Sequence, residues 1–305
     1  MSQATVTPWS VARDGCDQCL PASTQTLSSD CTWSFHEARE FLEEEWRQAL
    51  GRQSLPPLTE MMSYALSGGK RLRGLLLMAV ADCCNGPRQQ AREAAVAIEM
   101  LHAASLVVDD LPAFDDSSMR RGAPSVHKQF GEDAAILTAH ALVAGAFEVV
   151  AQINCEPERL LRVIRRLAGA IGARGMARAE AVDPHSVNPC DYCVAPDAHI
   201  RALKTGGLFQ LAAHTGAVLA GVEPGIAAEL AQLGLRLGIC FQLADDFRDE
   251  LMDESTRRLL RETVRRSWQD CTEQFSLVRG QLPRPDPMEL WLSVFYEASG
   301  EVHEA

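Results

Sequence analysis

Apolar residues recur at spacings of three and four along most of the chain from Trp33 onward, which is the periodicity of helices that bury one face. Turn residues such as Pro56-Pro57 and Asn85-Gly86-Pro87 separate these runs. No β-hairpin signature and no short fixed-period repeat interrupts the series. The pattern predicts a helix that starts near Trp33 and further helices over 57–67, 70–84, 88–110, 131–151, 157–181, 196–219, 224–250, 254–279 and 287–298. The predicted fold class is therefore all-α.

The first 31 residues lack this periodicity and are rich in Ser, Thr, Gln and Asp. Such a segment buries too little apolar surface to offset the entropy of ordering, so we expect residues 1–31 to form a disordered or loosely attached tail. Residues 32–305 are long and apolar enough to form one helical bundle around a single core.

Charge and hydropathy narrow the function classes. The net charge of −12 argues against a nucleic-acid surface, which requires a basic patch. We expect no apolar run to approach the ~20 residues of a transmembrane helix, because charged residues such as Asp82 and Glu148 interrupt the longest candidates. The N-terminus has no secretory pattern. We expect a soluble cytoplasmic protein without a transmembrane segment.

The ten cysteines raise the question of a metal site or disulfides. Cys16/Cys19 and Cys190/Cys193 each form a Cys-x-x-Cys pair, but more than 170 residues separate the two pairs, unlike the spacing of a local zinc site. Five other cysteines fall within helical patterns, where a free thiol acts as a small hydrophobe. We expect reduced thiols, with a metal site or disulfide as the alternative.

Two acidic clusters carry the candidate chemistry. Residues 109–122 read DDLPAFDDSSMRRG, placing four carboxylates and two guanidinium groups directly after an apolar helix. Carboxylates this close repel one another unless cations lie between them. Mg²⁺ is usually held by one or two carboxylates plus substrate phosphates, and arginine grips phosphate through paired donors. A solvated acidic loop before a basic helix start is the plainer alternative.

The second cluster, DDFRD at 245–249, also ends an apolar helix. Asp245 and Asp249 are one turn apart on a helix, and Gln242 lies one turn before Asp245. If the two acidic helix ends face each other, they form a cleft that collects Mg²⁺ ions and a diphosphate.

Basic residues near the first cluster suit a second anion. Lys70 and Arg73 share a face and follow Gly68-Gly69 at a helix start, where free backbone N–H groups point outward. His102 precedes Asp109 by two helical turns on the same face. The chain has three lysines, and their scarcity favours a functional role for Lys70 and Lys204.

Together these motifs resemble the trans-isoprenyl diphosphate synthases, most closely the bacterial geranylgeranyl diphosphate synthases. The resemblance is carried by the two aspartate-rich motifs, by Gly68-Gly69-Lys70-Arg71-Leu72-Arg73, by His102, by Lys204-Thr205 and by Phe241-Gln242, and it runs from about Trp33 to about Glu250. It implies a single large helical bundle of the isoprenoid synthase type with a central active-site cavity, and a homodimer.

The resemblance also implies the residue roles. Three Mg²⁺ ions with bound diphosphate would be held or supported by Asp109, Asp110, Asp115, Asp116, Asp245, Asp246 and Asp249, of which Asp109, Asp115 and Asp245 are the direct ligands. The allylic diphosphate would contact Arg120 and Lys204, and isopentenyl diphosphate would contact Lys70, Arg73, His102 and Arg121. Thr205 and Gln242 would stabilise positive charge or orient the metal-bound phosphate.

Product length follows from the helix that ends at Asp109. Ser105 and Ala104 lie about 6–7.5 Å below that end, at ~1.5 Å per residue. Similar bacterial farnesyl diphosphate synthases carry an aromatic residue at the position of Ala104, so the small side chains here favour a C20 product over C15. Farnesyl diphosphate synthesis is the first alternative. A regulatory subunit of a heteromeric synthase and a class I terpene cyclase are the others.

One departure from the family concerns the segment after Asp249. Relatives carry a loop with a Gly-Lys pair there, whereas this chain runs directly into a new helical pattern and has no lysine after Lys204. Arg257 or Arg258 is the candidate replacement for the missing cation.

Overall fold

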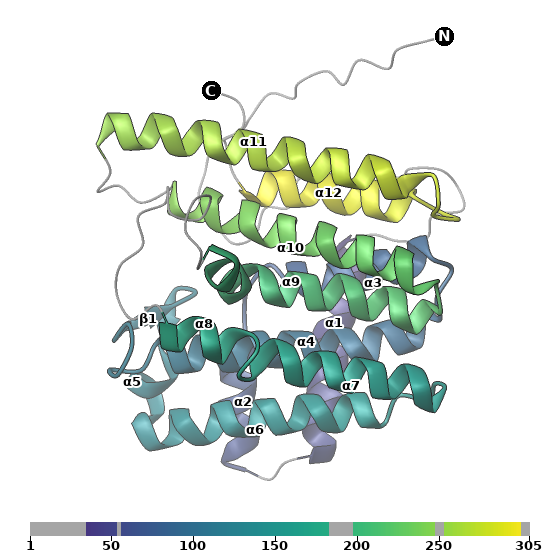
Figure 1. The fold of residues 1–305 in the computed structure, drawn as a ribbon. Helices are drawn as coiled ribbons and strands as arrows, with labels where there is room; N and C mark the ends of the chain where they lie inside the picture. The colour runs from purple at the N-terminus through teal and green to yellow at the C-terminus, as the bar shows by residue number, and fades with distance from the viewer. Residues whose placement is uncertain (1–34, 54–55, 183–197, 248–252, 300–305) are drawn as a thin grey trace.

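The computed structural model describes residues 35–53, 56–182, 198–247 and 253–299. Within these ranges it is a stack of helices, shown in Figure 1: α1 (Phe35–Gln53), α2 (Leu58–Leu66), α3 (Leu72–Cys83), α4 (Arg88–Asp109), α5 (Val126–Phe130), α6 (Glu132–Ala151), α7 (Pro157–Ile171), α8 (Met176–Val182), α9 (Ala198–Ala220), α10 (Pro224–Asp246), α11 (Glu254–Arg279) and α12 (Asp286–Ser299). The prediction of an all-α bundle is confirmed. The predicted tail, residues 1–31, lies outside the described residues.

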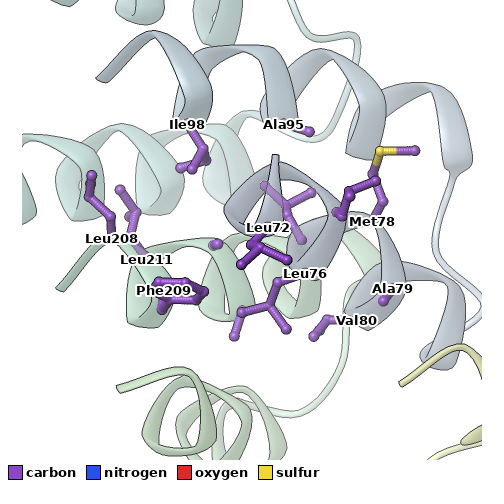
Figure 2. Close-up of a cluster of buried hydrophobic side chains, with 14 of the residues drawn as sticks. Leu72, Leu76, Met78, Ala79, Val80, Ala95, Ile98, Leu208, Phe209 and Leu211 are labelled. Atoms are coloured by element: carbon purple, nitrogen blue, oxygen red, sulfur yellow. The ribbon is translucent and has the colours of Figure 1, made fainter. Parts of the chain in front are cut away.

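The core lies where α3, α4, α9 and α10 pack together. Figure 2 shows α3 contributing Leu72 and Leu76 between Ile98 of α4 and Phe209 of α9. All four side chains are at most 5% exposed, as expected for helices that are apolar on more than one face. Of these helices, α4 and α10 end in the candidate acidic clusters, so the packed core determines where the carboxylates lie.

Two local predictions were wrong. The helix expected over 157–181 is broken after Ile171, because Gly172 adopts an extended backbone and glycine is a weak helix former. No β-hairpin was expected from the sequence, but residues 119–124 form a short antiparallel hairpin of β1 (Met119–Arg120) and β2 (Ala123–Pro124). Both turn residues, Arg121 and Gly122, have positive φ, as a two-residue type I′ turn requires.

Two helices, α6 and α10, are long and apolar enough to cross a membrane by length and composition. This corrects the expectation that no run approaches that length. About half of each apolar window is buried inside the bundle, 50% in α6 and 56% in α10, which is also the property of core helices in a helical bundle.

The described cysteines agree with the prediction of free thiols. Cys83, Cys84, Cys155, Cys240 and Cys271 are all free, and burial raises the pKa of the Cys84 thiol to about 11. The two Cys-x-x-Cys pairs lie outside the described residues.

Candidate active site

The first acidic motif begins at the last residue of α4. Asp109 is half-buried and its backbone carbonyl accepts a hydrogen bond from the N–H of Asp115 (2.9 Å), which curls the loop back over the helix end. Asp115 itself is exposed. The loop therefore brings two of the predicted metal-binding carboxylates to one end of one helix.

Asp110 points away from solvent. Its side chain is 3% exposed and accepts three hydrogen bonds from Arg120, from Nε to Oδ1 (3.0 Å) and Oδ2 (3.2 Å) and from Nη2 to Oδ1 (2.5 Å). The hydrogen bonds to Asp110 raise the pKa of Arg120. The carboxylate predicted to support the metal and the arginine predicted to contact the allylic diphosphate are thus bound to each other.

The hairpin places the second arginine of the motif against the turn that precedes α3. Arg121 Nη1 donates to the carbonyls of Ser67 (3.0 Å) and Gly68 (3.3 Å). Gly69 is required here, because its φ is +89° and a Cβ atom would lie 2.9 Å from Arg121 Cζ. Burial lowers the pKa of Arg121.

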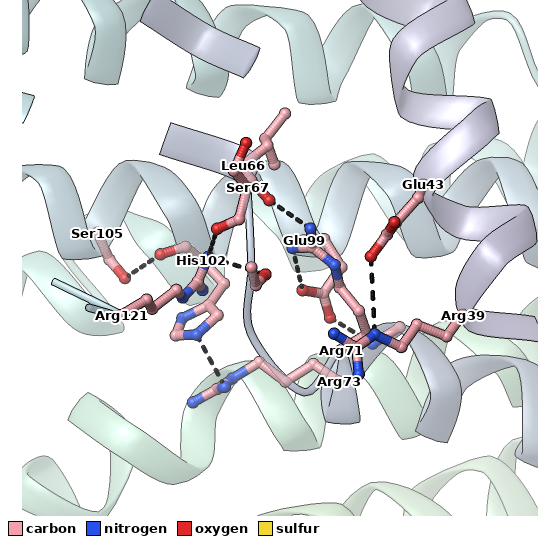
Figure 3. Close-up of polar contacts among 12 residues, drawn as sticks. Arg39, Glu43, Leu66, Ser67, Arg71, Arg73, Glu99, His102, Ser105 and Arg121 are labelled. Atoms are coloured by element: carbon pink, nitrogen blue, oxygen red, sulfur yellow. Dashed lines mark hydrogen bonds and ion pairs between the residues drawn. The ribbon is translucent and has the colours of Figure 1, made fainter. Parts of the chain in front are cut away.

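Arg73 and His102 meet directly, as Figure 3 shows. Arg73 Nη1 lies 3.1 Å from His102 Nε2, and its guanidinium carbon lies 4.5 Å from the centre of the Phe209 ring. Burial lowers the pKa of Arg73 to about 10. Burial and the neighbouring arginines, Arg73 first, hold the pKa of His102 well below its usual value. His102 is therefore neutral, accepts at Nε2 and carries its proton on Nδ1.

Two buried partners of this cluster were missed by sequence reasoning. Arg71, 3% exposed, pairs with Glu99, 4% exposed, at 3.7 Å, and Glu99 also accepts a hydrogen bond from the Gly74 N–H at 2.8 Å. A glutamate inside the otherwise apolar run from Ala94 to Leu101 was the available signal, since a buried acid requires a partner.

Lys70, exposed at the same turn, donates to the carbonyl of Ala298 near the end of α12 (2.9 Å).

Asp116 is bound by Lys128 at 3.1 Å and lies 3.5 Å from His127. The pKa of Asp116 is lowered, mainly by the hydrogen bond from Lys128. Lys128 and His127 were not predicted as partners of the motif.

The second acidic motif ends α10. Gln242 donates to Asp246 (2.5 Å), and Asp245 is exposed at the tip of the helix. Figure 1 shows this tip on the same side of the bundle as β1, which lies in the last part of the first motif. Asp249 and the side chains of Lys204 and Thr205 lie outside the described residues. Within the part of the chain that the structure describes, no three His, Cys, Asp or Glu side chains are gathered to hold a metal ion.

Arginines of α11, the helix after α10, are the candidate replacements for the cation of the missing Gly-Lys loop. Arg257 and Arg261 of α11 place their guanidinium carbons 5.6 and 5.4 Å from the centre of the Phe247 ring. Arg258, the other candidate, is exposed. Arg261 was not predicted, although it follows Arg257 by one helical turn.

The predicted chain-length residues lie on α4. Ala104 is 3% exposed, and the half-buried Ser105 donates its hydroxyl to the carbonyl of His102 (2.9 Å). Both side chains are small and neither is placed in solvent.

Comparison with known proteins places this site in a family. Residues 55–258 match the family model described as polyprenyl synthetase. A geranylgeranyl diphosphate synthase of Cereibacter sphaeroides is 40% identical over 210 residues, which is 68% of this chain and 69% of that protein. Geranylgeranyl pyrophosphate synthase 11 of Arabidopsis thaliana is 39% identical over 67% of this chain, but the matched region spans only 58% of that relative's length.

Solved structures agree on the fold. The FPP/GFPP synthase of Zymomonas mobilis superposes with a TM-score of 0.74 at 27% identity, covering 87% of this chain and 97% of that one. The geranyltransferase of Helicobacter pylori, solved with magnesium and isoprenyl diphosphate, superposes with a TM-score of 0.75 at 23% identity, covering 89% and 99%. With two acidic helix ends, an arginine–histidine cluster and these relatives, the chain belongs to the polyprenyl synthetase family.

Proposed function

We propose that the protein condenses isopentenyl diphosphate with allylic diphosphates to make all-trans geranylgeranyl diphosphate (C20), with Mg²⁺ as cofactor. The observation that carries the proposal is the convergence of Arg73, His102 and Arg121 beside the Asp110–Arg120 pair. Relatives that share about 40% identity are named geranylgeranyl diphosphate synthases, which supports the product.

The arginine–histidine cluster fits a diphosphate. Arg73 and Arg121 are only partly exposed, so water screens their attraction to an anion less than it would for fully exposed side chains. Neutral His102 supplies a hydrogen-bond donor at Nδ1 rather than another charge. Lys70 lies at the same turn and adds a point charge when it leaves the Ala298 carbonyl. This cluster would bind isopentenyl diphosphate and hold its double bond beside the allylic carbon.

The acidic residues fit magnesium in kind and in number. Carboxylate oxygens are the hard ligands that Mg²⁺ prefers, and the ion usually takes one or two of them together with substrate phosphates. Asp109, Asp115 and Asp245 would hold the ions, three in number with diphosphate bound. When bound, these ions would supply positive charge that neutralises the leaving diphosphate.

Side chains of the protein would bind the leaving diphosphate and stabilise the cation. Arg120, fixed by Asp110, and Lys204 would bind the departing diphosphate, and Thr205 and Gln242 would stabilise the positive charge on the prenyl carbon. The buried helices around the site exclude water from that cation. The condensation product would then lose a proton, for which the departing diphosphate is the proposed base. The small side chains at Ala104 and Ser105 support C20 over C15.

We also propose a homodimer, as the family resemblance implies. Helix α6 exposes Ile136 (57%) and Leu137 (61%), and a second copy of this chain would cover them. Light scattering coupled to gel filtration would measure the mass of the unaltered protein and of Leu137→Glu. A monomeric mass for the unaltered chain contradicts the dimer. The cytoplasmic location stays a prediction.

One assay separates the candidate functions. Purified protein is incubated with Mg²⁺, labelled isopentenyl diphosphate and an allylic starter, and the products are resolved by chain length. A C20 product supports the proposal, and a C15 product the farnesyl alternative. Cyclic products formed without isopentenyl diphosphate indicate a cyclase. A chain that folds and binds isopentenyl diphosphate but makes no product indicates a regulatory subunit.

A further inference from the structure

We infer that Glu99 is a positioning residue for the isopentenyl diphosphate subsite. Through Arg71 and the backbone of Gly74 it fixes the turn from which Lys70 and Arg73 reach the ligand. The inference rests on the proposed function, because the ligand is the one named there. Glu99 itself does not touch the ligand.

The first step concerns burial. Glu99 is 4% exposed in the middle of α4, and its carboxylate is bound by the Gly74 N–H (2.8 Å) and by the guanidinium of Arg71 (3.7 Å). Figure 3 shows Glu99 beside Arg71. A carboxylate in such a place remains charged only when it is paired and hydrogen-bonded. Arg71 and the first turn of α3 are therefore tied to a fixed point on α4.

The second step concerns the backbone of the turn. Arg71 is the residue before the first residue of α3 and adopts a left-handed conformation, with φ 55° and ψ 24°. Residues other than glycine rarely adopt that conformation, so the surroundings of Arg71 must hold it there. The Arg71 guanidinium donates to the carbonyl of Leu66, the last residue of α2, while it pairs with Glu99. One side chain thus joins the end of α2, the start of α3 and the middle of α4.

The third step connects the turn to the ligand-binding cations. Arg73 lies two residues after Arg71, and Arg121 binds the carbonyls of Ser67 and Gly68 in the same turn. His102, which accepts from Arg73, lies one helical turn after Glu99 on α4. Three arginines converge here, and the negative charge of Glu99 opposes the burial effect on both Arg73 and Arg121. A shift of the turn displaces all the predicted contacts at once.

Electrostatics alone and the positioning role predict opposite effects of removing the Glu99 charge on diphosphate binding. Glu99 is an anion near a site for an anion, so removing its charge strengthens the attraction of the site for a diphosphate if nothing moves. The positioning role predicts weaker binding, because Arg71 would keep a buried charge without an anionic partner and the turn would relax. The sign of the change therefore distinguishes the two effects.

The test compares Glu99→Gln with Asp82→Asn. Asp82, at the other end of α3, is also 4% exposed and also pairs with an arginine at the start of α4, Arg88 at 2.9 Å. It controls for the loss of a buried carboxylate between the same two helices. Calorimetry would measure the binding of isopentenyl diphosphate alone, and steady-state kinetics the KM for each substrate. Urea unfolding would follow stability.

For Glu99→Gln we expect the Kd and the KM for isopentenyl diphosphate to rise by about ten- to a hundredfold, the scale of an ångström-sized misplacement. The KM for the allylic substrate should stay within about twofold of the unaltered value. Asp82→Asn should lose stability and leave both KM values unchanged. Unchanged or tighter binding by Glu99→Gln overturns the inference, as does an equal rise of both KM values.

A second variant covers the case in which Glu99→Gln does not fold. Arg71→Lys keeps the charge opposite Glu99 but removes the planar fork that also reaches Leu66, so the same selective rise in KM is expected. An unchanged KM there overturns the inference. If the unaltered chain binds isopentenyl diphosphate without elongating it, the proposed activity fails and the Kd comparison still decides the role of Glu99. If it does not bind the ligand, both fail.

Discussion

Asp110→Asn tests whether Asp110 serves mainly to orient Arg120, while other carboxylates of the first acidic motif bind the metal. The carboxylate is 3% exposed and accepts three hydrogen bonds from Arg120. Asparagine keeps the shape but loses the charge, and its amide group has only one acceptor oxygen. Arg120 would lose the hydrogen bonds to one of the two oxygens and the charge on the other, and with them its fixed orientation.

The size of the effect follows from burial. Removing one partner of a fully buried ion pair costs about 3–5 kcal/mol. The Arg120 side chain is 37% exposed, so water screens and replaces part of the interaction. A hydrogen bond to a charged group contributes about 1.5–3 kcal/mol, and we expect Asp110→Asn to lower the free energy of unfolding by about 2 kcal/mol. This is roughly a thirtyfold change in the folding equilibrium.

The assay combines urea unfolding with a magnesium titration of the condensation reaction. Asp109→Asn serves as the comparison, because Asp109 is half-buried at the helix end and is predicted to bind the metal directly. Asp109→Asn should raise the Mg²⁺ concentration for half-maximal rate. Asp110→Asn should lower the rate through Arg120 with little change in that concentration. The reasoning is refuted if Asp110→Asn retains full stability and shifts the magnesium requirement as much as Asp109→Asn.

Three further predictions follow from buried positions. Ala104→Tyr should shorten the product below C20. Because Ala104 is 3% exposed, the larger side chain should also lower the free energy of unfolding by about 1–3 kcal/mol through overpacking. An unchanged C20 product in an active variant would show that the prenyl tail runs elsewhere. His214 is 9% exposed and burial lowers its pKa to about 4, so between pH 6.5 and 4 the unfolded chain binds a proton that the folded chain does not. The free energy of unfolding should therefore fall as the pH falls through that window, by at most about 1.4 kcal/mol per pH unit, and urea titrations of His214→Gln should lack this component. Gly238→Ala places a Cβ atom 2.4 Å from Gly206 Cα between α10 and α9, so it should cost at least about 1 kcal/mol in urea unfolding, whereas Gly225→Ala on the same helix meets open space and should be neutral or slightly stabilising; equal effects would contradict the close packing.

The sequence predicted the elements and the chemistry that depend on short spacings. Apolar periodicity gave the helices, because residues three and four apart share a helical face whatever packs against it. The same rule placed His102 and Asp109 on one face of α4, and the helix end placed Asp109 and Asp110 at its tip. The family motifs were recognisable because their residues are close together in the chain.

Other features depended on residues that are distant in sequence or on backbone dihedral angles. The break after Ile171 and the hairpin at 119–124 arise from local backbone angles that apolar spacing does not report. The two arginines over Phe247 became apparent only when α11 was placed against the end of α10.

The sequence by itself determined that two acidic helix ends and a basic turn exist, because composition and short-range spacing are properties of the chain. Only the tertiary structure decided that Glu99 pairs with Arg71 and that Asp110 is bound by Arg120. The physical reason is that a buried charge is partnered by whatever group the packing brings within hydrogen-bond distance. Arg71 and Glu99 are 28 positions apart, and no spacing rule joins two such residues until α3 packs on α4.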